Sequence, residues 1–248
     1  QRLPTADYLV GWVDCTAGGR GLGRGGIHEA NYVPREEDPV GPRSVQLDRQ
    51  GLPTSVLGVP KQWLPLFARP FVNNLGIRLI NAGKYHLSRI RDRDRPFYQS
   101  HVSFAFLLDY IPGWESAYGR EGLIQFQVFA PTAVAPRVFR QVIERSRSRG
   151  LPSYLGVMKR HRPDPFLLSH ALDGYSLALD YPVRSAHAAR QAQLFRELID
   201  LVLENGGKFY FAKDSLISAD DTLRAYGSPA LQRFFELKQR LDPASLLE

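Results

Sequence analysis

The chain has 248 residues, and 32 Lys and Arg against 25 Asp and Glu give a formal net charge of +7. Hydrophobic residues make up 44% of the sequence and aromatic residues 11%, which excludes a chain that is disordered throughout. A single cysteine, Cys15, excludes an internal disulfide framework and a cysteine-based zinc site, so we expect a protein of a reducing compartment, the cytoplasm.

Three further classes are disfavoured by the sequence. No stretch approaches the roughly 18 to 20 apolar residues of a membrane-spanning helix, and the N-terminus lacks the layout of a signal peptide. The basic residues fall in short clusters at 89–95, 145–149 and 159–162 without any nucleic-acid-binding motif, so we expect no nucleic-acid partner. Because the sequence starts just before a predicted strand and ends without a polar tail, we expect a fragment of a longer protein.

The first 70 residues predict little regular structure. Residues 8–14, YLVGWVD, are aromatic and β-branched and predict a strand. The loop at 17–26 holds six glycines but lacks the Gly-Lys-Ser/Thr ending of a P-loop and a following long helix, which favours a surface turn over a phosphate site. Seven prolines between 33 and 70 predict an extended connection, with at most a short helix at 63–67.

Residues 71–248 alternate between strand and helix patterns. Leu123 to Ala130 alternates Gln125 and Gln127 with apolar residues, which predicts a strand with one polar and one apolar face. The other predicted strands are 101–110, 154–159, 175–181 and 209–212. The predicted helices are 74–82, 136–149, 187–204, one capped by Ser218, and 229–240. We therefore expect an α+β fold, an antiparallel sheet flanked by helices.

Several kinds of chemistry lack their motifs. The six histidines form no HExxH and no i,i+4 pair, so we expect no metal site. No GxSxG elbow is present and Cys15 has no flanking base motif, which disfavours covalent hydrolysis.

The predicted strands carry a group of residues that could line a ligand-binding surface. It comprises amides, a hydroxyl, a phenol and two lysines, together with an alanine between polar neighbours: Gln125, Gln127, Lys159, Ser176, Ala178, Tyr210 and Lys213. These groups suit an anionic or hydroxylated ligand. A solvent-facing sheet surface explains the same pattern equally well.

Several blocks of sequence resemble a known family. GGKFYFAKDSLIS at 206–218, followed by LKQRLDP at 237–243, resembles the C-terminal part of FAD-linked oxidases of the vanillyl-alcohol-oxidase superfamily, in particular the decaprenylphosphoryl-ribose 2-oxidase group. FLLDYIPGWESAYGREGLIQFQVFAP at 106–131, LGVMKR at 155–160 and DGYSLALDYPV at 173–183 continue the resemblance in the same order. YLVGWVD near the N-terminus resembles the start of that family's substrate domain.

The resemblance implies a domain and a set of site residues. Residues 1–248 would form the substrate-binding domain, with 33–70 as an extended connection inside it and with the FAD-binding domain of the same protein missing. Lys213 matches a lysine close to the reacting carbon and the flavin, and Tyr210 matches a tyrosine that contacts FAD. Substrate-binding positions are matched by Gln125, Gln127, Lys159, Ser176, Ala178 and Trp12. Mycobacterial members have a cysteine at the position of Ala178, so no covalent capture of an inhibitor is expected there.

The implied activity is oxidation of an alcohol on a sugar or polyol-like substrate by hydride transfer to FAD. A lysine suits this reaction, because an ammonium stabilises the negative charge on the reduced flavin and shuttles the hydroxyl proton if burial lowers its pKa. The structural alternative for Lys213 is a salt bridge to Asp214 or a helix cap. Two alternatives for the whole chain stay open: a stand-alone, non-catalytic binding module, and a basic protein that binds anionic polymers.

Overall fold

The computed structural model describes residues 6–56, 58–91, 96–105, 111–213 and 216–246. The chain forms two compact units. The first combines Gln1–Leu9 with Gly26–Leu123, and the second combines Val10–Gly25 with Ile124–Glu248.

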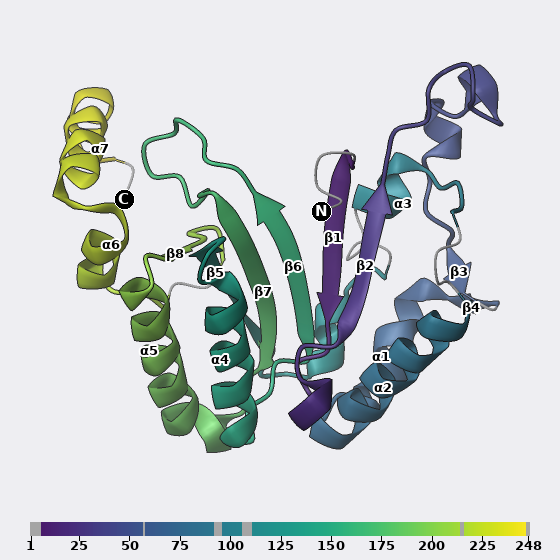
Figure 1. Cartoon of the computed structure of the whole chain (residues 1–248), viewed down its shortest axis with the longest axis horizontal. Coiled ribbons are helices and arrows are strands. Elements are labelled where there is room, and N and C mark those ends of the chain that lie inside the picture. Colours follow the sequence, from purple (N-terminus) through teal and green to yellow (C-terminus); the bar gives the residue numbers. More distant parts are fainter. Residues whose placement is uncertain (1–5, 57, 92–95, 106–110, 214–215, 247–248) are drawn as a thin grey trace. The chain divides into compact units, whose positions relative to one another are not determined.

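Within the described residues, one sheet of six strands organises the chain (Figure 1). Its strands are β1 (Tyr8–Val13), β2 (Gly25–Ala30), β5 (Leu123–Pro131), β6 (Leu155–His161), β7 (Gly174–Pro182) and β8 (Lys208–Phe209). They are ordered β2-β1-β6-β7-β5-β8. Strands β1 and β6, β6 and β7, and β5 and β8 pair antiparallel. This confirms the predicted α+β fold with an antiparallel sheet.

The second unit contains four helices, and two of them cover one face of this sheet. They are α4 (Ala135–Ser148), α5 (Ala188–Glu204), α6 (Ala219–Tyr226) and α7 (Ser228–Leu241). Helices α4 and α5 lie side by side along the strands, while α6 packs on α5 and β8 and α7 packs on α6 (Figure 1). Helices α4, α5 and α7 begin and end within one residue of their predicted bounds, and for α6 the sequence predicted the start. Ser218 caps α6 as expected, since its hydroxyl accepts from the Asp221 N–H while the Asp221 carboxylate accepts from the Ser218 N–H.

The hydrophobic core lies between these helices and the apolar side of β5 and β7. Val128 of β5 is fully buried, and Leu177 and Leu179 of β7 are each 1% exposed. The helices contribute residues at helical spacing, including Val138, Val142, Leu194, Leu198 and Val202. Burying each such side chain stabilises the fold by about 1.5–3 kcal/mol. Because the apolar residues of β5 must therefore face the helices, its polar residues lie on the opposite face of the sheet, where a ligand could bind.

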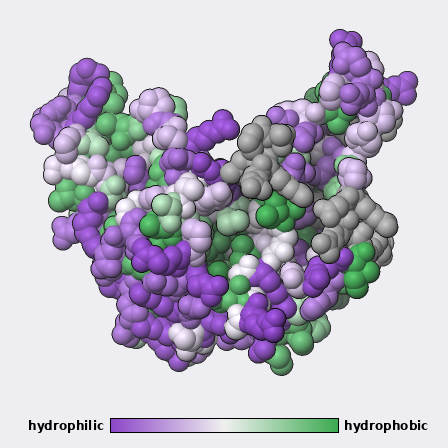
Figure 2. All heavy atoms as spheres, in the orientation of Figure 1, coloured by the Kyte–Doolittle hydropathy of each residue, from purple (hydrophilic) through white to green (hydrophobic). Residues whose placement is uncertain are grey.

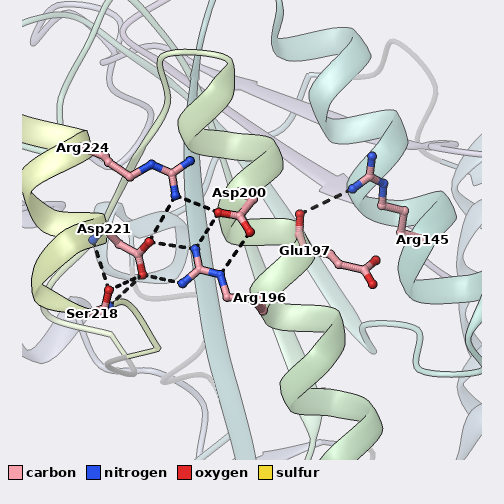
Figure 3. A network of polar contacts seen from close by, with 7 residues as sticks. All are labelled: Arg145, Arg196, Glu197, Asp200, Ser218, Asp221 and Arg224. Carbon is pink, nitrogen blue, oxygen red and sulfur yellow. Dashed lines mark hydrogen bonds and ion pairs between the residues drawn. The ribbon is translucent and has the colours of Figure 1, made fainter.

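A charged network joins α5 to α6 (Figure 3). Arg196 donates to both carboxylate oxygens of Asp221, at 2.7 and 2.8 Å, and also to Asp200. Arg224 donates to Asp200 at 2.8 Å. The Arg196 hydrogen bond holds the pKa of the buried Asp221 carboxyl well below its usual range. This network therefore fixes the helix that follows the β8 region.

The glycine-rich loop is organised by a buried carboxylate. Asp14, fully buried, accepts from the N–H groups of Thr16 and Ala17 and from the Thr16 hydroxyl through one oxygen, and from Arg24 Nε at 2.8 Å through the other. These N–H, hydroxyl and guanidinium donors of the loop are therefore already bonded to the Asp14 carboxylate. The loop is a compact turn between β1 and β2, and β2 itself was not predicted.

The first unit contains the short hairpin β3 (Ser55–Val56) and β4 (Val59–Pro60) and the helices α1 (Leu64–Ala68), α2 (Asn74–Arg91) and α3 (His101–Ala105). Short α1 agrees with the predicted helix at 63–67, whereas α2 continues well beyond the predicted end at residue 82. The predicted strand at 101–110 is wrong over 101–105, which are helical, and 106–110 lie outside the described residues. No helix in the described ranges combines the length and the apolar character needed to cross a membrane.

Candidate functional site

The register of the sheet brings the predicted site residues to one face. Trp12 pairs with Val157, which pairs with Ala178, and Lys159 pairs with Ser176. Cross-strand partners share a face of a sheet, so these side chains lie on the side opposite the helix-covered core. Gln125 and Gln127 occupy the same side of β5, since they alternate with the buried Phe126 and Val128.

Lys213 joins this face from the segment that follows β8. Its Nζ donates to Oε1 of Gln125 at 2.7 Å, and Nε2 of Gln125 donates to Oδ1 of Asp180 at 3.1 Å. The two bonds fix the orientation of the Gln125 amide, because one end accepts and the other donates. An ammonium and a buried carboxylate are thus linked through one amide. The alternative partner from the sequence, Asp214, lies outside the described residues.

Ser176 is held from two sides. Nε2 of Gln127 lies 3.3 Å from its Oγ as a donor, and Nε2 of His161 lies 2.8 Å from the same oxygen. Burial, followed by the nearby His170, lowers the pKa of His161 to about 4, so the ring is neutral at neutral pH. With its proton on Nδ1, the neutral imidazole accepts the hydroxyl proton while Oγ accepts from Gln127; with its proton on Nε2, the imidazole donates and Oγ accepts from both. In either tautomer, Ser176 Oγ is held by two hydrogen bonds.

Aromatic rings extend the face towards Tyr210. Phe129 lies 4.9 Å from the ring of His161 and 4.7 Å from that of His170, and His170 lies 4.5 Å from Tyr210. Lys208, which pairs with Phe129 across the strands, donates to the Ser169 carbonyl at 3.0 Å. Desolvation also lowers the pKa of His170. These contacts place Tyr210 on the same face as the glutamines.

A small pocket opens where these groups meet. Its volume of about 10 Å³ accommodates one water molecule. Both predicted catalytic and cofactor residues line it, together with an amide and several apolar side chains: Phe126, Gln127, Phe209, Tyr210, Phe211, Lys213, Leu216 and Ile217. The pocket marks the part of the face where a cation, a phenol and an amide surround the same space.

The remaining predicted residues lie farther along the sheet. Lys159 is exposed, Ala178 is half-buried, and Trp12 is 8% exposed. Lys159 lies in the same row of the sheet as Ser176, and Ala178 and Trp12 lie in the next row, on either side of Val157. The structure thus groups the candidates into two bonded clusters, Lys213 with Gln125 and Gln127 with Ser176, and leaves Lys159, Ala178 and Trp12 as neighbours on the same face.

Two site residues were missed from the sequence. His161 and His170 were dismissed because they match no metal-ligand spacing, yet both lie against Phe129. The usable signal was the position of His161, two residues after Lys159 and thus on the same side of β6. His170 comes from the loop after β6, where no periodicity predicts its direction. Among the described residues, no three His, Cys, Asp or Glu side chains gather as metal ligands.

Comparison with known proteins relates the chain to an oxidase. No family model matches it. The chain is 31% identical over 146 residues to decaprenylphosphoryl-beta-D-ribose oxidase of Mycolicibacterium smegmatis, an alignment that covers 58% of this chain and 30% of the oxidase. This protein is a distant relative of that oxidase. It is also 28% identical over 251 residues to an uncharacterized protein in the mprA 5' region of Streptomyces coelicolor, covering 99% of the chain and 65% of the relative. The chain therefore spans less than two thirds of either relative.

Proposed function

We propose that this chain is the substrate-binding part of an FAD-dependent oxidoreductase that oxidises an alcohol group of a sugar or polyol-like substrate. The observation that carries the proposal is the position of Lys213. Its ammonium group lines the pocket beside Tyr210 while Gln125 accepts one of its protons at 2.7 Å. The similarity to an oxidase of a phosphorylated ribose lipid supports the same reaction class.

Lys213 would stabilise the negative charge that develops on the hydride acceptor during the reaction. An ammonium carries three donors, and Gln125 uses one of them, which leaves two for a ligand in the pocket. Removing hydride from an alcohol leaves a carbonyl, while negative charge accumulates on the acceptor and the hydroxyl proton must depart. A fixed cation next to that charge lowers the barrier, because it needs no reorientation during the reaction.

Tyr210 and Lys213 suit contact with the ring system of FAD. Both line one pocket, and Phe211, which lines it with them, is 44% exposed, whereas Phe126 and Phe209 are buried in the core. A phenol and an exposed phenyl ring suit a planar conjugated ring, and a cation complements its reduced, anionic form. FAD, when bound, supplies the hydride acceptor. We infer that a further domain of the same protein holds most of the cofactor, and that Tyr210 and Lys213 contact its ring from this side.

The bonded pair of Gln127 and Ser176 would recognise the substrate. Hydroxyl groups of a sugar both donate and accept hydrogen bonds, as an amide and a serine do. Because His161 also holds Oγ of Ser176, the pair presents a preorganised arrangement. Lys159, exposed in the adjacent strand, would bind an anionic group of the substrate, and Ala178 and Trp12 would line the apolar part of the site.

The proposal is tested on the protein made from its complete gene. We expect a bound flavin, visible in the absorbance spectrum, that is reduced anaerobically by a sugar or polyol substrate. Lys213→Met should keep the flavin and lower kcat by about 100-fold or more, as removal of a charge-stabilising donor does in other enzymes. Lys238→Met, on α7, is the matched control and should leave kcat unchanged.

Two outcomes contradict the proposal. A complete gene product without flavin, even after reconstitution with FAD, would leave the stand-alone binding module as the function. A flavoprotein in which Lys213→Met retains full turnover would remove the assigned role of Lys213. A cytoplasmic location stays a prediction, tested by fractionating cells that express the native protein.

A further inference from the structure

Helix α2 turns its apolar side towards solvent. Leu75, Leu79 and Leu87 are 68%, 63% and 60% exposed, and Ile90 is 79% exposed. In contrast, the polar Asn81 of the same helix is 6% exposed. Hydrophobic side chains reach the surface over α2 on the face seen in Figure 2. A helix that packs on a core normally shows the reverse arrangement, so this exposed apolar side needs an explanation.

The exposed residues form one continuous stripe. Leu75, Leu79, Leu87 and Ile90 follow one another at spacings of four, eight and three residues, and Gly83 occupies the turn between the middle two. At 100° per residue these positions fall within one sector of the helix surface. Ile80, half exposed, widens the stripe on one side. The stripe runs the length of an 18-residue helix, about 27 Å at 1.5 Å per residue.

The charges of α2 all have one sign. Residues 74–91 contain three arginines and one lysine and no aspartate or glutamate. Arg78 and Arg89 are eleven residues apart, about three turns, and therefore share one flank of the stripe. Lys84 lies on the opposite flank. An apolar stripe with cations on both sides is the pattern of helices that lie in a membrane interface.

Exposed aromatic residues also precede α2 in the same unit. Trp63 is 50% exposed, and Phe67 and Phe71 are 61% and 59% exposed. Phe71 belongs to the turn before α2, and its carbonyl lies so close to Gly76 that a Cβ there would come within 2.2 Å. The exposed Phe71 is thus adjacent to the first turn of α2. Tryptophan and phenylalanine at such a position suit the boundary between lipid headgroups and acyl chains.

We propose that α2, with the aromatic residues before it, docks on the surface of an anionic phospholipid bilayer. The stripe enters the boundary of the acyl chains, while the flanking arginines and lysine contact lipid phosphates. A second copy of the chain fits this helix less well, because two such stripes in contact would bring eight like charges together with no acid on either α2. The inference does not depend on the proposed oxidoreductase chemistry.

The test is sedimentation of the complete protein with vesicles. We expect binding to phosphatidylcholine vesicles that contain phosphatidylglycerol, weaker binding to phosphatidylcholine alone, and loss of binding at high salt. Leu79→Ser with Leu87→Ser should lower the partition coefficient by about tenfold or more. Arg78→Gln with Arg89→Gln should lower it on anionic vesicles only. Leu47→Ser and Arg43→Gln, also exposed, are the matched controls and should bind as wild type.

Three results would overturn the inference. The first is no binding to anionic vesicles, or equal binding by all variants. The second is a dimer, measured by light scattering, that the Leu79→Ser, Leu87→Ser variant converts to a monomer. The third is a large loss of thermal stability in that variant of the complete protein, which would show that another part of the chain covers the stripe. If the leucine variant does not fold, the Arg78→Gln, Arg89→Gln variant still tests whether α2 binds anionic vesicles.

Discussion

Lys213 and Gln125 are 88 residues apart in the chain, yet Nζ of the first donates to Oε1 of the second at 2.7 Å. The same amide donates to Asp180, so one glutamine connects a cation to a buried carboxylate. A lysine side chain has four rotatable bonds, and an amide that accepts from it at a fixed point removes much of that freedom. Gln125 is therefore a positioning residue for Lys213 in the proposed function.

The first prediction is energetic coupling between these two residues. In the complete flavoprotein, Gln125→Leu should lower kcat by about tenfold, because Lys213 loses its fixed partner. The double variant with Lys213→Met should be no slower than Lys213→Met alone, which gives a coupling free energy of about 1 kcal/mol or more. A double-mutant cycle on kcat measures it. Strict additivity of the two effects would contradict the positioning role.

The second prediction concerns His161 and pH. Its pKa in the folded protein is about 4, below the value of 6.5 for a free histidine. The unfolded chain therefore takes up a proton between pH 6.5 and 4 that the folded protein does not, so this residue makes stability fall as the pH is lowered through that range. Thermal melts should show a smaller acid-induced loss of Tm for His161→Gln than for wild type. The variant His28→Gln, at an exposed histidine, is the control measured over the same pH range.

The third prediction concerns the link between α5 and α6. Asp221→Asn should lower the free energy of unfolding by about 1–3 kcal/mol, since the neutral amide cannot accept both Arg196 bonds. The wild-type carboxyl has a lowered pKa, so its contribution is present above the usual carboxyl range and is lost as the pH falls below about 4. Urea unfolding at pH 7 and at pH 3 tests both points.

The control for that experiment is the neighbouring residue. Asp220 is exposed in the first turn of the same helix, so Asp220→Asn should cost less than about 1 kcal/mol at pH 7. Equal effects of the two substitutions would mean that helix-end charge, and not the Arg196 bonds, stabilises α6.

The fourth prediction concerns a close approach of two strands. A Cβ on Gly174 of β7 would lie 2.1 Å from the carbonyl oxygen of Ala130 in β5. Gly174→Ala should therefore destabilise the protein by about 1–3 kcal/mol through displacement of the strand. Gly51→Ala, where a Cβ meets open space, should change stability little. Urea titrations of the two variants compare them directly, and similar midpoints would contradict the prediction.

The sequence predicted those parts of the fold that have a clear period. Alternation in β5 identified both its core face and its polar face, and Ser218 with Asp221 identified the start of α6. It failed at 101–105 because a short apolar and aromatic run is compatible with either strand or helix. Strand β2 was missed because Gly25–Ala30 has few apolar residues and owes its conformation to pairing.

The sequence named the candidate residues but not the contacts between them. The resemblance to a family and the alternation of β5 selected Gln125, Gln127, Ser176 and Lys213. In the structure the strand pattern puts the first three on one face, and Lys213 reaches that face through its bond to Gln125. Nothing local indicated which amide bonds which partner, because the three contacts of the two glutamine amides each span more than 45 residues. Assignment of roles to these residues stays a prediction until the kinetic experiments are done.

Cys15 determines how the candidate face can be observed. It is the single cysteine of the chain, it is 2% exposed, and burial next to Asp14 raises the pKa of its thiol. Thiol reagents react with the thiolate, so the native thiol of this chain is silent towards them at neutral pH. A cysteine introduced in place of the half-buried Ala178 would be the one addressable thiol of these 248 residues. A fluorophore or nitroxide placed there would report ligand arrival at the sheet without removal of any native side chain from the core.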